Sequence, residues 1–183
     1  ISKIPAKKRL ADFPNYLIHR AEQLENLYIF TNTEGTPENI RKFHPNIIVS
    51  STGSAPLLPP IAGLKDRIDN EDYNIYSILG MINHINDFPK DLEGKKVVVV
   101  GGGAVGLDVV EFFADRNADI SIVEMMDQIG RDLDPVSKND TKAMMKKHNV
   151  HQLTKTALLE VKDSSFLVKV DGEPYEIPFE YGF

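Results

Sequence analysis

The 183-residue sequence contains no cysteine and no tryptophan. Without cysteine, these residues cannot supply disulfides, iron–sulfur ligands or a redox-active cysteine pair. No apolar run approaches the roughly 20 residues of a bilayer-spanning helix. Basic residues are also few, since 21 lysines and arginines accompany 27 acidic residues for a net charge of −6. This balance argues against nucleic acid or an anionic membrane as a partner. The absence of cysteine fits a cytoplasmic protein, which we expect.

The remaining composition suits a folded protein. Hydrophobic residues make up 42% of the sequence and charged residues 26%, which is typical of globular proteins. The length allows one large domain, or one domain and a piece of another. The chain begins at Ile1 rather than methionine and ends at Phe183 just after an apolar run has begun. We expect both ends to continue in a longer protein.

The most informative stretch is KKVVVVGGGAVGLDVVEFFADRNADISIVE, residues 95–124. Its pattern predicts a buried strand at 97–100, a G-x-G-x-x-G turn at 101–106, a helix at 104–116 and a strand at 120–123. On that helix, Val105, Val109, Phe112 and Phe113 are expected to lie on one side. An acidic residue, Glu124, ends the second strand. This order is the fingerprint of a dinucleotide-binding βαβ unit, although a glycine turn that binds nothing is the structural alternative.

Each residue of this motif has a physical task in dinucleotide binding. Gly101 permits the tight turn, Gly103 allows a diphosphate to approach the backbone, and Gly106 lets the helix pack closely. Glu124 would accept hydrogen bonds from the adenosine ribose, which favours NAD over NADP; Arg131 is the one nearby residue that argues otherwise. Met125 and Met126 could flank the adenine, although core methionines are commoner. The predicted NAD(H)-binding residues are Gly101, Gly103, Ala104, Val105, Gly106, Glu124 and Met125.

The rest of the chain reads as alternating helices and strands. We expect helices at 14–24, 74–88 and 135–148, the last capped by Asp134 with Val136, Ala143 and Met144 inward. Short strands are expected at 27–30, 46–51, 150–153, 157–161, 166–170 and 175–178, with a proline-rich linker near 56–60. Histidines at 148 and 151 have metal-like spacing but no further ligand beside them, so no metal site and no catalytic residue are predicted.

Residues 95–124 resemble the second dinucleotide-binding unit of the flavoprotein oxidoreductases that contain two dinucleotide domains. IIVSSTGSAPLLPPIAGL resembles the stretch in which that superfamily leaves its FAD domain, and the terminal IPFEYGF resembles the strand that returns to it. Together they are most similar to the C-terminal half of NADH:flavin oxidoreductases of the 2-enoate reductase and 2,4-dienoyl-CoA reductase type. That family joins this half to an FMN-binding barrel of the old yellow enzyme kind with a four-iron cluster.

The resemblance implies an α/β fold: a Rossmann-like three-layer NAD(P)-binding domain with a small β-meander, plus a partial FAD-domain remnant. Residues 1–68 would be the remnant and linker, and 69–183 an NAD(H)-binding domain truncated at its C-terminus. Ser51-Thr52-Gly53 would touch FAD in the intact enzyme, whereas the glycine fingerprint for the FAD diphosphate is missing. Asp108 occupies a position where relatives usually carry a glutamate near the nicotinamide, and a plain helix-stabilising role is the alternative for it.

The functional expectation follows from what the chain retains. NAD(H) would be its own cofactor, whereas FAD, FMN and the iron–sulfur cluster would belong to the intact parent. Its partners would be NADH and the remainder of the parent flavoenzyme. The isolated chain is expected to bind NADH without turnover, and to form homo-oligomers through the apolar surface of the FAD remnant. The alternatives are a segment of a pyridine nucleotide–disulfide reductase and a non-catalytic, redox-sensing NAD-binding module.

Overall fold

The computed structural model describes residues 1–183, which divide into two compact units. The larger unit comprises Ile1–Lys8 and Leu58–Phe183, and the smaller unit comprises Arg9–Leu57. This division follows contacts between residues; the assignment of 1–68 to an FAD remnant and of 69–183 to an NAD(H) domain stays a prediction. None of the helices combines the length and the apolar character that crossing a membrane requires.

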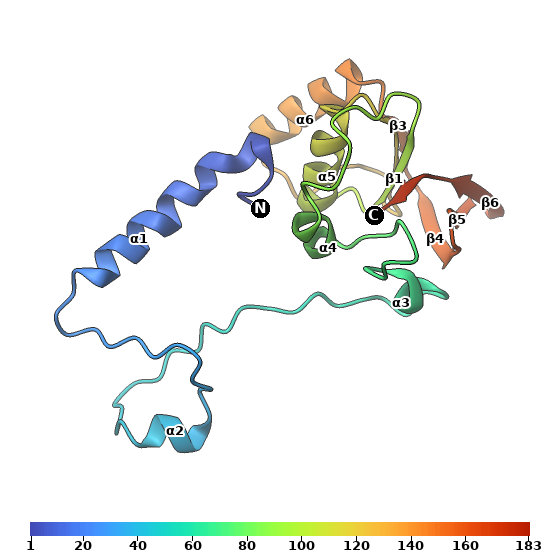
Figure 1. The fold of residues 1–183 in the computed structure, drawn as a ribbon. Helices are drawn as coiled ribbons and strands as arrows, with labels where there is room; N and C mark the ends of the chain where they lie inside the picture. Colours follow the sequence, from blue (N-terminus) through green and yellow to red (C-terminus); the bar gives the residue numbers. More distant parts are fainter. The chain divides into compact units, whose positions relative to one another are not determined.

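A four-stranded parallel sheet forms the middle of the larger unit, in the order β3-β2-β1-β7 (Figure 1). Its strands are β1 (Lys96–Val100), β2 (Asp119–Val123), β3 (His151–Leu153) and β7 (Tyr181–Gly182). The pairing aligns Val97 with Ile120 and also with Tyr181. The terminal strand, expected to lead back to an FAD domain, is therefore an edge strand of this sheet and pairs with β1.

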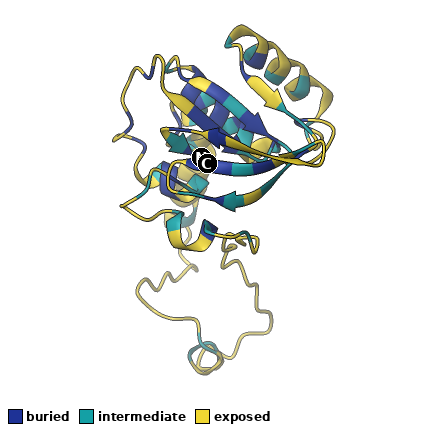
Figure 2. Cartoon of the chain, turned by 90° about the vertical axis from the view of Figure 1, so that its right-hand side faces the viewer, coloured by how far each residue is buried: buried dark blue, intermediate teal, exposed yellow.

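Helices cover one face of the parallel sheet. They are α4 (Ile78–Asn83), α5 (Ala104–Ala114) and α6 (Pro135–Lys147). Side chains alternate along a strand, so Val97 and Val99 of β1 pack in the helix-side core with Phe112 and Phe113 of α5. Phe88 adds edge-on ring contacts to both of these phenylalanines, with centroids 6.0 and 5.2 Å away. The dark interior of the larger unit in Figure 2 is this core together with the one on the opposite face.

A three-stranded antiparallel meander covers the opposite face. It consists of β4 (Thr156–Val161), β5 (Ser165–Val170) and β6 (Glu173–Pro178) in sequential order. Val98 of β1 packs on this side in a core that includes Phe166 and Val168. The turn between β5 and β6 places Asp171 and Gly172 at φ 49° and 95°, as a two-residue hairpin with two left-handed residues requires. The three-layer fold and the meander predicted from sequence are confirmed.

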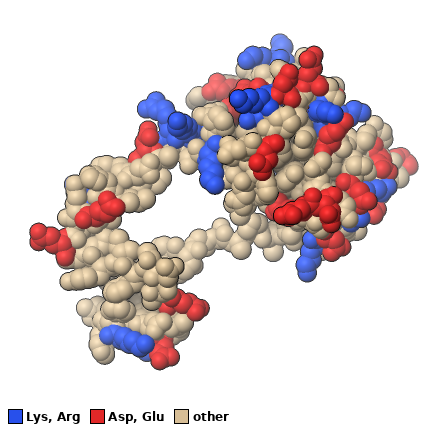
Figure 3. Space-filling view, viewed as in Figure 1, with Lys and Arg blue, Asp and Glu red and all other residues tan.

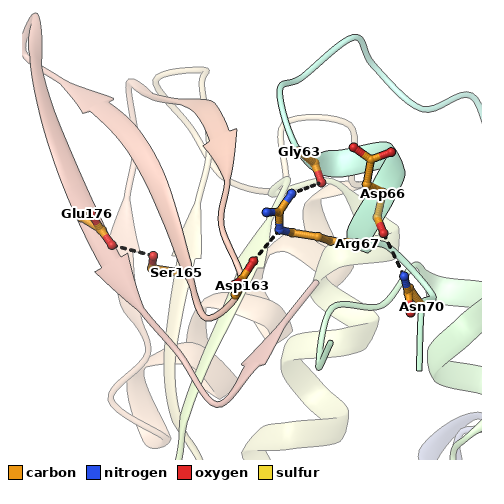
Figure 4. A network of polar contacts seen from close by, with 7 residues as sticks. All are labelled: Gly63, Asp66, Arg67, Asn70, Asp163, Ser165 and Glu176. Carbon is orange, nitrogen blue, oxygen red and sulfur yellow. Dashed lines mark hydrogen bonds and ion pairs between the residues drawn. The ribbon is translucent and has the colours of Figure 1, made fainter. Parts of the chain in front are cut away.

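The short chain segment that precedes α4 packs against this meander. It contains α3 (Leu64–Arg67), and Figure 4 shows Arg67 between the meander and its own helix start. The Arg67 Nε donates to Asp163 Oδ1 at 2.9 Å, and its Nη1 donates to the Gly63 carbonyl at 3.3 Å. Gly63 has φ 75°, and a Cβ there would lie 2.1 Å from the Val161 carbonyl oxygen. The segment thus becomes one wall of a cavity described below.

The N-terminal segment of the larger unit enters the helix-side core. Ile4 is fully buried there. The observed elements that follow are a 3-10 helix, Pro5–Ala11, and then α1, Asp12–Glu22. Ile4 thereby links the start of the chain to the sheet formed nearly 100 residues later.

The smaller unit contains all of α1 and the short helix α2 (Pro37–Arg41), and no strand. The strands predicted at 27–30 and 46–51 are wrong, because both stretches are irregular and exposed. No residue between 9 and 57 is buried, which the yellow ribbon of this segment in Figure 2 reflects. An extended apolar stretch becomes a strand only where another strand offers hydrogen bonds, and none does here.

Acidic and basic side chains are interspersed on the surface. On the face of the larger unit drawn in Figure 3, red and blue groups alternate without a continuous basic patch. This distribution agrees with the net charge of −6.

Candidate dinucleotide-binding site

The glycine turn between β1 and α5 is tightly constrained. The Gly101 N–H donates to the Val123 carbonyl at 2.8 Å, which closes the turn against β2. Gly101 has φ 108°, a conformation that only glycine adopts readily. A Cβ on Gly106 would lie 1.9 Å from the Gly101 carbonyl oxygen. Both positions therefore require glycine, whatever the turn binds.

Gly103 differs from these two glycines. A Cβ on Gly103 would meet only the Asp132 carboxylate, at 3.6 Å, which is ordinary van der Waals contact. Its backbone is extended, with φ −79° and ψ −178°, and any residue could adopt it. Packing therefore does not explain glycine here, and close approach of a ligand to the backbone does.

The N-terminus of α5 presents free hydrogen-bond donors. Gly103 is its N-cap, no side chain caps it, and no acidic residue occupies its first turn. The first backbone hydrogen bond of α5 runs from the Leu107 N–H to the Gly103 carbonyl, at 3.1 Å. The N–H groups of Gly103, Ala104 and Val105 donate to no backbone carbonyl. Together with the positive end of the helix dipole, they can receive an anion such as a diphosphate.

Glu124 is held beside this turn by backbone donors. Its Oε2 accepts from the Gly102 N–H and its Oε1 from the Met126 N–H, both at 2.7 Å. These bonds fix the carboxylate at the end of β2. Each carboxylate oxygen has a second lone pair, so the group can still accept hydrogen bonds from two vicinal hydroxyls of a ligand.

Two cavities of the larger unit meet at the glycine turn. The apolar cavity, of about 470 Å³, is walled by the α3 segment, the meander and the start of α4. The polar cavity, of about 400 Å³, is lined by Gly102, Gly103, Glu124, Met126, Gln128, Arg131 and Asp132. Both cavities reach Gly103. An elongated ligand with a polar sugar at one end and a flat ring at the other would fit across them.

The structure brings most of the predicted site residues to these cavities. The apolar cavity is lined by the predicted residues Gly101, Gly103, Ala104, Val105 and Gly106, and the polar cavity by Glu124. Val105 is 53% exposed and lines the apolar cavity, so it does not share the burial of Val109, Phe112 and Phe113, with which it was expected to form one side of the helix. Met125 is 71% exposed and lines neither cavity, whereas Met126 lines the polar one.

Asp108 points away from both cavities. Its Oδ1 lies 2.8 Å from the Nζ of Lys7, which also lies 3.4 Å from Glu111 Oε2. The hydrogen bond with Asp108 and the two negative charges raise the pKa of Lys7. Asp108 therefore holds the N-terminal segment on α5. Sequence reasoning missed this pairing, because a separation of about 100 residues leaves no local pattern.

Other residues that sequence reasoning missed also come from distant or irregular segments. Asp132 lines both cavities from the loop between β2 and α6. Ser77, the N-cap of α4, lines the apolar cavity and is hydrogen-bonded through its N–H to Asp69 at 2.7 Å. His151 was not missed but was considered as a metal ligand with His148, and it lies 3.5 Å from Asp119 on the adjacent strand, outside both cavities.

The fold and the site together define a Rossmann-type nucleotide-binding unit: a parallel sheet, a glycine turn and an acid at the end of the second strand. The sequence profile of the pyridine nucleotide-disulphide oxidoreductases matches residues 23–181. The chain belongs to this family, whose members are NAD(P)H-dependent flavoprotein oxidoreductases.

The chain is similar to two curated proteins and to one solved structure of known name. The chain is 26% identical over 160 residues to an NADH oxidase of Thermoanaerobacter brockii, covering 87% of this chain and 23% of that protein. It is 25% identical over 209 residues to a metal reductase of Desulforamulus reducens, covering 95% and 29%. The solved structure of a 2-naphthoyl-CoA reductase superposes with a TM-score of 0.76 at 21% identity, covering 99% of this chain and 26% of that one. The chain thus spans about a quarter of the length of these proteins.

Proposed function

We propose that the larger unit binds NAD(H) and acts within a longer flavoenzyme as the site where NADH is held for hydride transfer to FAD. Electrons would continue to FMN and reduce an activated C=C bond of the 2-enoate or dienoyl-CoA type. The observation that carries the binding proposal is the geometry at Gly103, where free N–H groups, the anchored Glu124 and two cavities meet. The resemblance to enoate reductases and the similarity to a 2-naphthoyl-CoA reductase support the choice of parent reaction.

The residues present fit NAD(H) in a definite orientation. The diphosphate would lie over Gly103 and the N–H groups of Ala104 and Val105. Glu124 would accept the ribose hydroxyls in the polar cavity beside Met126. The nicotinamide would then enter the apolar cavity, whose lining is mostly apolar. NADH supplies the hydride when bound, and the protein groups bind and orient it.

The residues present do not form sites for the other cofactors. Iron–sulfur clusters need thiolate ligands, and the sequence has no cysteine. Ser51, Thr52 and Gly53 are exposed in the smaller unit and have no second glycine fingerprint beside them. FAD, FMN and the cluster would therefore be held by other parts of the proposed parent, and the isolated chain would bind NADH without turnover.

Calorimetric titration of the chain with NADH and NADPH tests the binding proposal. The additional 2′-phosphate would meet the negative charge of Glu124, so we expect NADH to bind about tenfold more tightly than NADPH. Glu124→Gln should reduce the ratio of NADH to NADPH affinity, because it removes the negative charge of the side chain and keeps its shape. Glu93→Gln, which removes an exposed carboxylate outside both cavities, should leave it unchanged. Equal or tighter binding of NADPH by the wild type would refute this assignment of Glu124.

A further inference from the structure

One carboxylate beside the glycine turn is not among the groups proposed to bind NAD(H). Asp132 belongs to the irregular loop between β2 and α6. The loop is fixed to the glycine turn by the Gly130 N–H, which donates to the Gly102 carbonyl at 2.7 Å. A second bond, from the Leu133 N–H to the Gly130 carbonyl at 3.2 Å, closes a turn around residues 131 and 132. The backbone on either side of Asp132 is therefore held near Gly103.

The side chain of Asp132 lies where the two cavities meet. Gly103 and Asp132 are the two residues that line both the apolar and the polar cavity. A Cβ built on Gly103 would lie 3.6 Å from one carboxylate oxygen of Asp132 and 3.8 Å from the other. The carboxylate thus faces the bare backbone over which the diphosphate is expected to pass.

The charge of Asp132 has no structural use within the protein. Its carboxylate is exposed, accepts no hydrogen bond and forms no ion pair, although Arg131 precedes it. The other acids near the turn differ in this respect. Glu124 accepts two backbone bonds, and Asp134 caps α6 by accepting from Val136 and Ser137. Removing the charge of Asp132 should therefore leave the fold intact.

We propose that Asp132 is an electrostatic gate of the dinucleotide site and lowers its affinity for NADH. This inference rests on the proposed function. A dinucleotide that spans both cavities must cross Gly103, where its two phosphate charges would meet the carboxylate of Asp132 at short range. Binding then requires the carboxylate to turn away from the diphosphate, and part of the attraction from the α5 N-terminus is offset by repulsion. Asp132 is thus an affinity-determining residue and takes no part in hydride transfer.

The test compares Asp132→Asn with Asp127→Asn in the full chain. Asp127 is on the same loop, is exposed and lines neither cavity, so its variant makes the same change in net charge. Calorimetry with NADH should show binding about five- to tenfold tighter for Asp132→Asn and unchanged for Asp127→Asn. The gain should shrink in high salt, because screening weakens the repulsion that the wild type still experiences. Adenosine, which carries no phosphate, should bind equally to both variants and to the wild type.

The outcomes separate this inference from the function it rests on. If the folded wild type binds NADH and Asp132→Asn binds it equally well, Asp132 does not lower the affinity and this inference is refuted. The proposal that the larger unit binds NAD(H) is then unaffected. If Asp132→Asn binds NADH more weakly, the carboxylate of Asp132 raises the affinity as a ligand of the nucleotide, and the inference is refuted. If none of the three folded proteins binds NADH, the proposed function itself fails and the gate fails with it.

Discussion

The larger and the smaller unit are both rich in large apolar side chains, yet only the larger unit buries them. Phe112, Phe113 and Ile122 are at most 2% exposed there, whereas Phe13 and Ile48 in the smaller unit are 68% and 64% exposed. The larger unit supplies its own sheet partners, because β1, β2, β3 and β7 pair with one another. The apolar stretches of the smaller unit have no such partners. Apolar patterning therefore leads to a core only where the chain also provides the surfaces that pack on it.

The largest expected effect distinguishes the two units by stability. Phe113→Ala removes a fully buried ring that contacts Phe112 and Phe183, and should lower the free energy of unfolding by about 3–5 kcal/mol. Phe13→Ala in the smaller unit should change it by less than about 0.5 kcal/mol. Urea unfolding followed by far-UV circular dichroism measures both. Similar losses for the two variants would mean that the smaller unit has a core of its own.

The second prediction concerns the N-terminal segment, which the structure assigns to the larger unit. Ile4→Ala should lower the free energy of unfolding by about 2–4 kcal/mol, because Ile4 is fully buried in the helix-side core. Ile1→Ala, at a residue 42% exposed, is the matched control and should have little effect. A negligible loss for Ile4→Ala in the same unfolding assay would place residues 1–8 outside the larger unit.

The third prediction concerns the exposed surface of the smaller unit. Unpaired apolar segments favour self-association, so sedimentation velocity should show oligomers that increase with protein concentration. Ile48→Lys should raise the dissociation constant about tenfold, equivalent to about 1.4 kcal/mol. Leu79→Lys, at an exposed residue of α4 in the larger unit, is the control and should not change it. A chain that stays monomeric at high concentration would contradict this prediction.

The smallest effect is expected from the ion pair between the N-terminal segment and α5. The hydrogen bond to Asp108 and the charges of Asp108 and Glu111 raise the pKa of Lys7 above its usual value, so the folded state favours the charged lysine. This contribution is fully present below the unfolded pKa and is lost as the pH rises through the folded pKa. Lys7→Met should therefore cost at most about 1 kcal/mol at pH 8, and this cost should disappear at strongly alkaline pH. Lys8→Met, at an exposed lysine without an ion pair, should show no such pH dependence in urea unfolding.

Local patterns predicted the parts of the fold whose partners are close in sequence. β1, α5 and β2 occur where the valine run, the glycine turn and the second apolar run indicated. The helix predicted from Asp134 and Pro135 is confirmed as α6, with the Asp134 carboxylate accepting from the Val136 N–H at 2.9 Å. The meander strands also occur near the expected positions. In each case a short-range signal, such as a cap or a two-residue turn, specifies the structure.

Tertiary packing decided the features that the sequence alone did not predict. Val136 and Ala143 of α6 are exposed although an inward position was expected. Met144 packs against the core as expected, and Met145 is buried in it. The helix predicted at 74–88 is only Ile78–Asn83, because Ile75 pairs in extended form with Gly182 of β7. At the site, the glycine turn and Glu124 were recognisable, whereas the place of Asp132 became visible only when its loop met the glycine turn. Away from the site, the pairing of Lys7 with Asp108 joins segments about 100 residues apart.

Hydrogen exchange of the whole chain, measured by mass spectrometry with and without NADH, tests the central claim most directly. Without ligand, amides of β1, α5 and β2 should exchange slowly and those of residues 9–57 rapidly. Saturating NADH should slow exchange at residues 101–106 and 124–132 and leave residues 9–57 unchanged. A larger unit that exchanges as fast as the smaller one, or NADH protection confined to residues 9–57, would contradict the account.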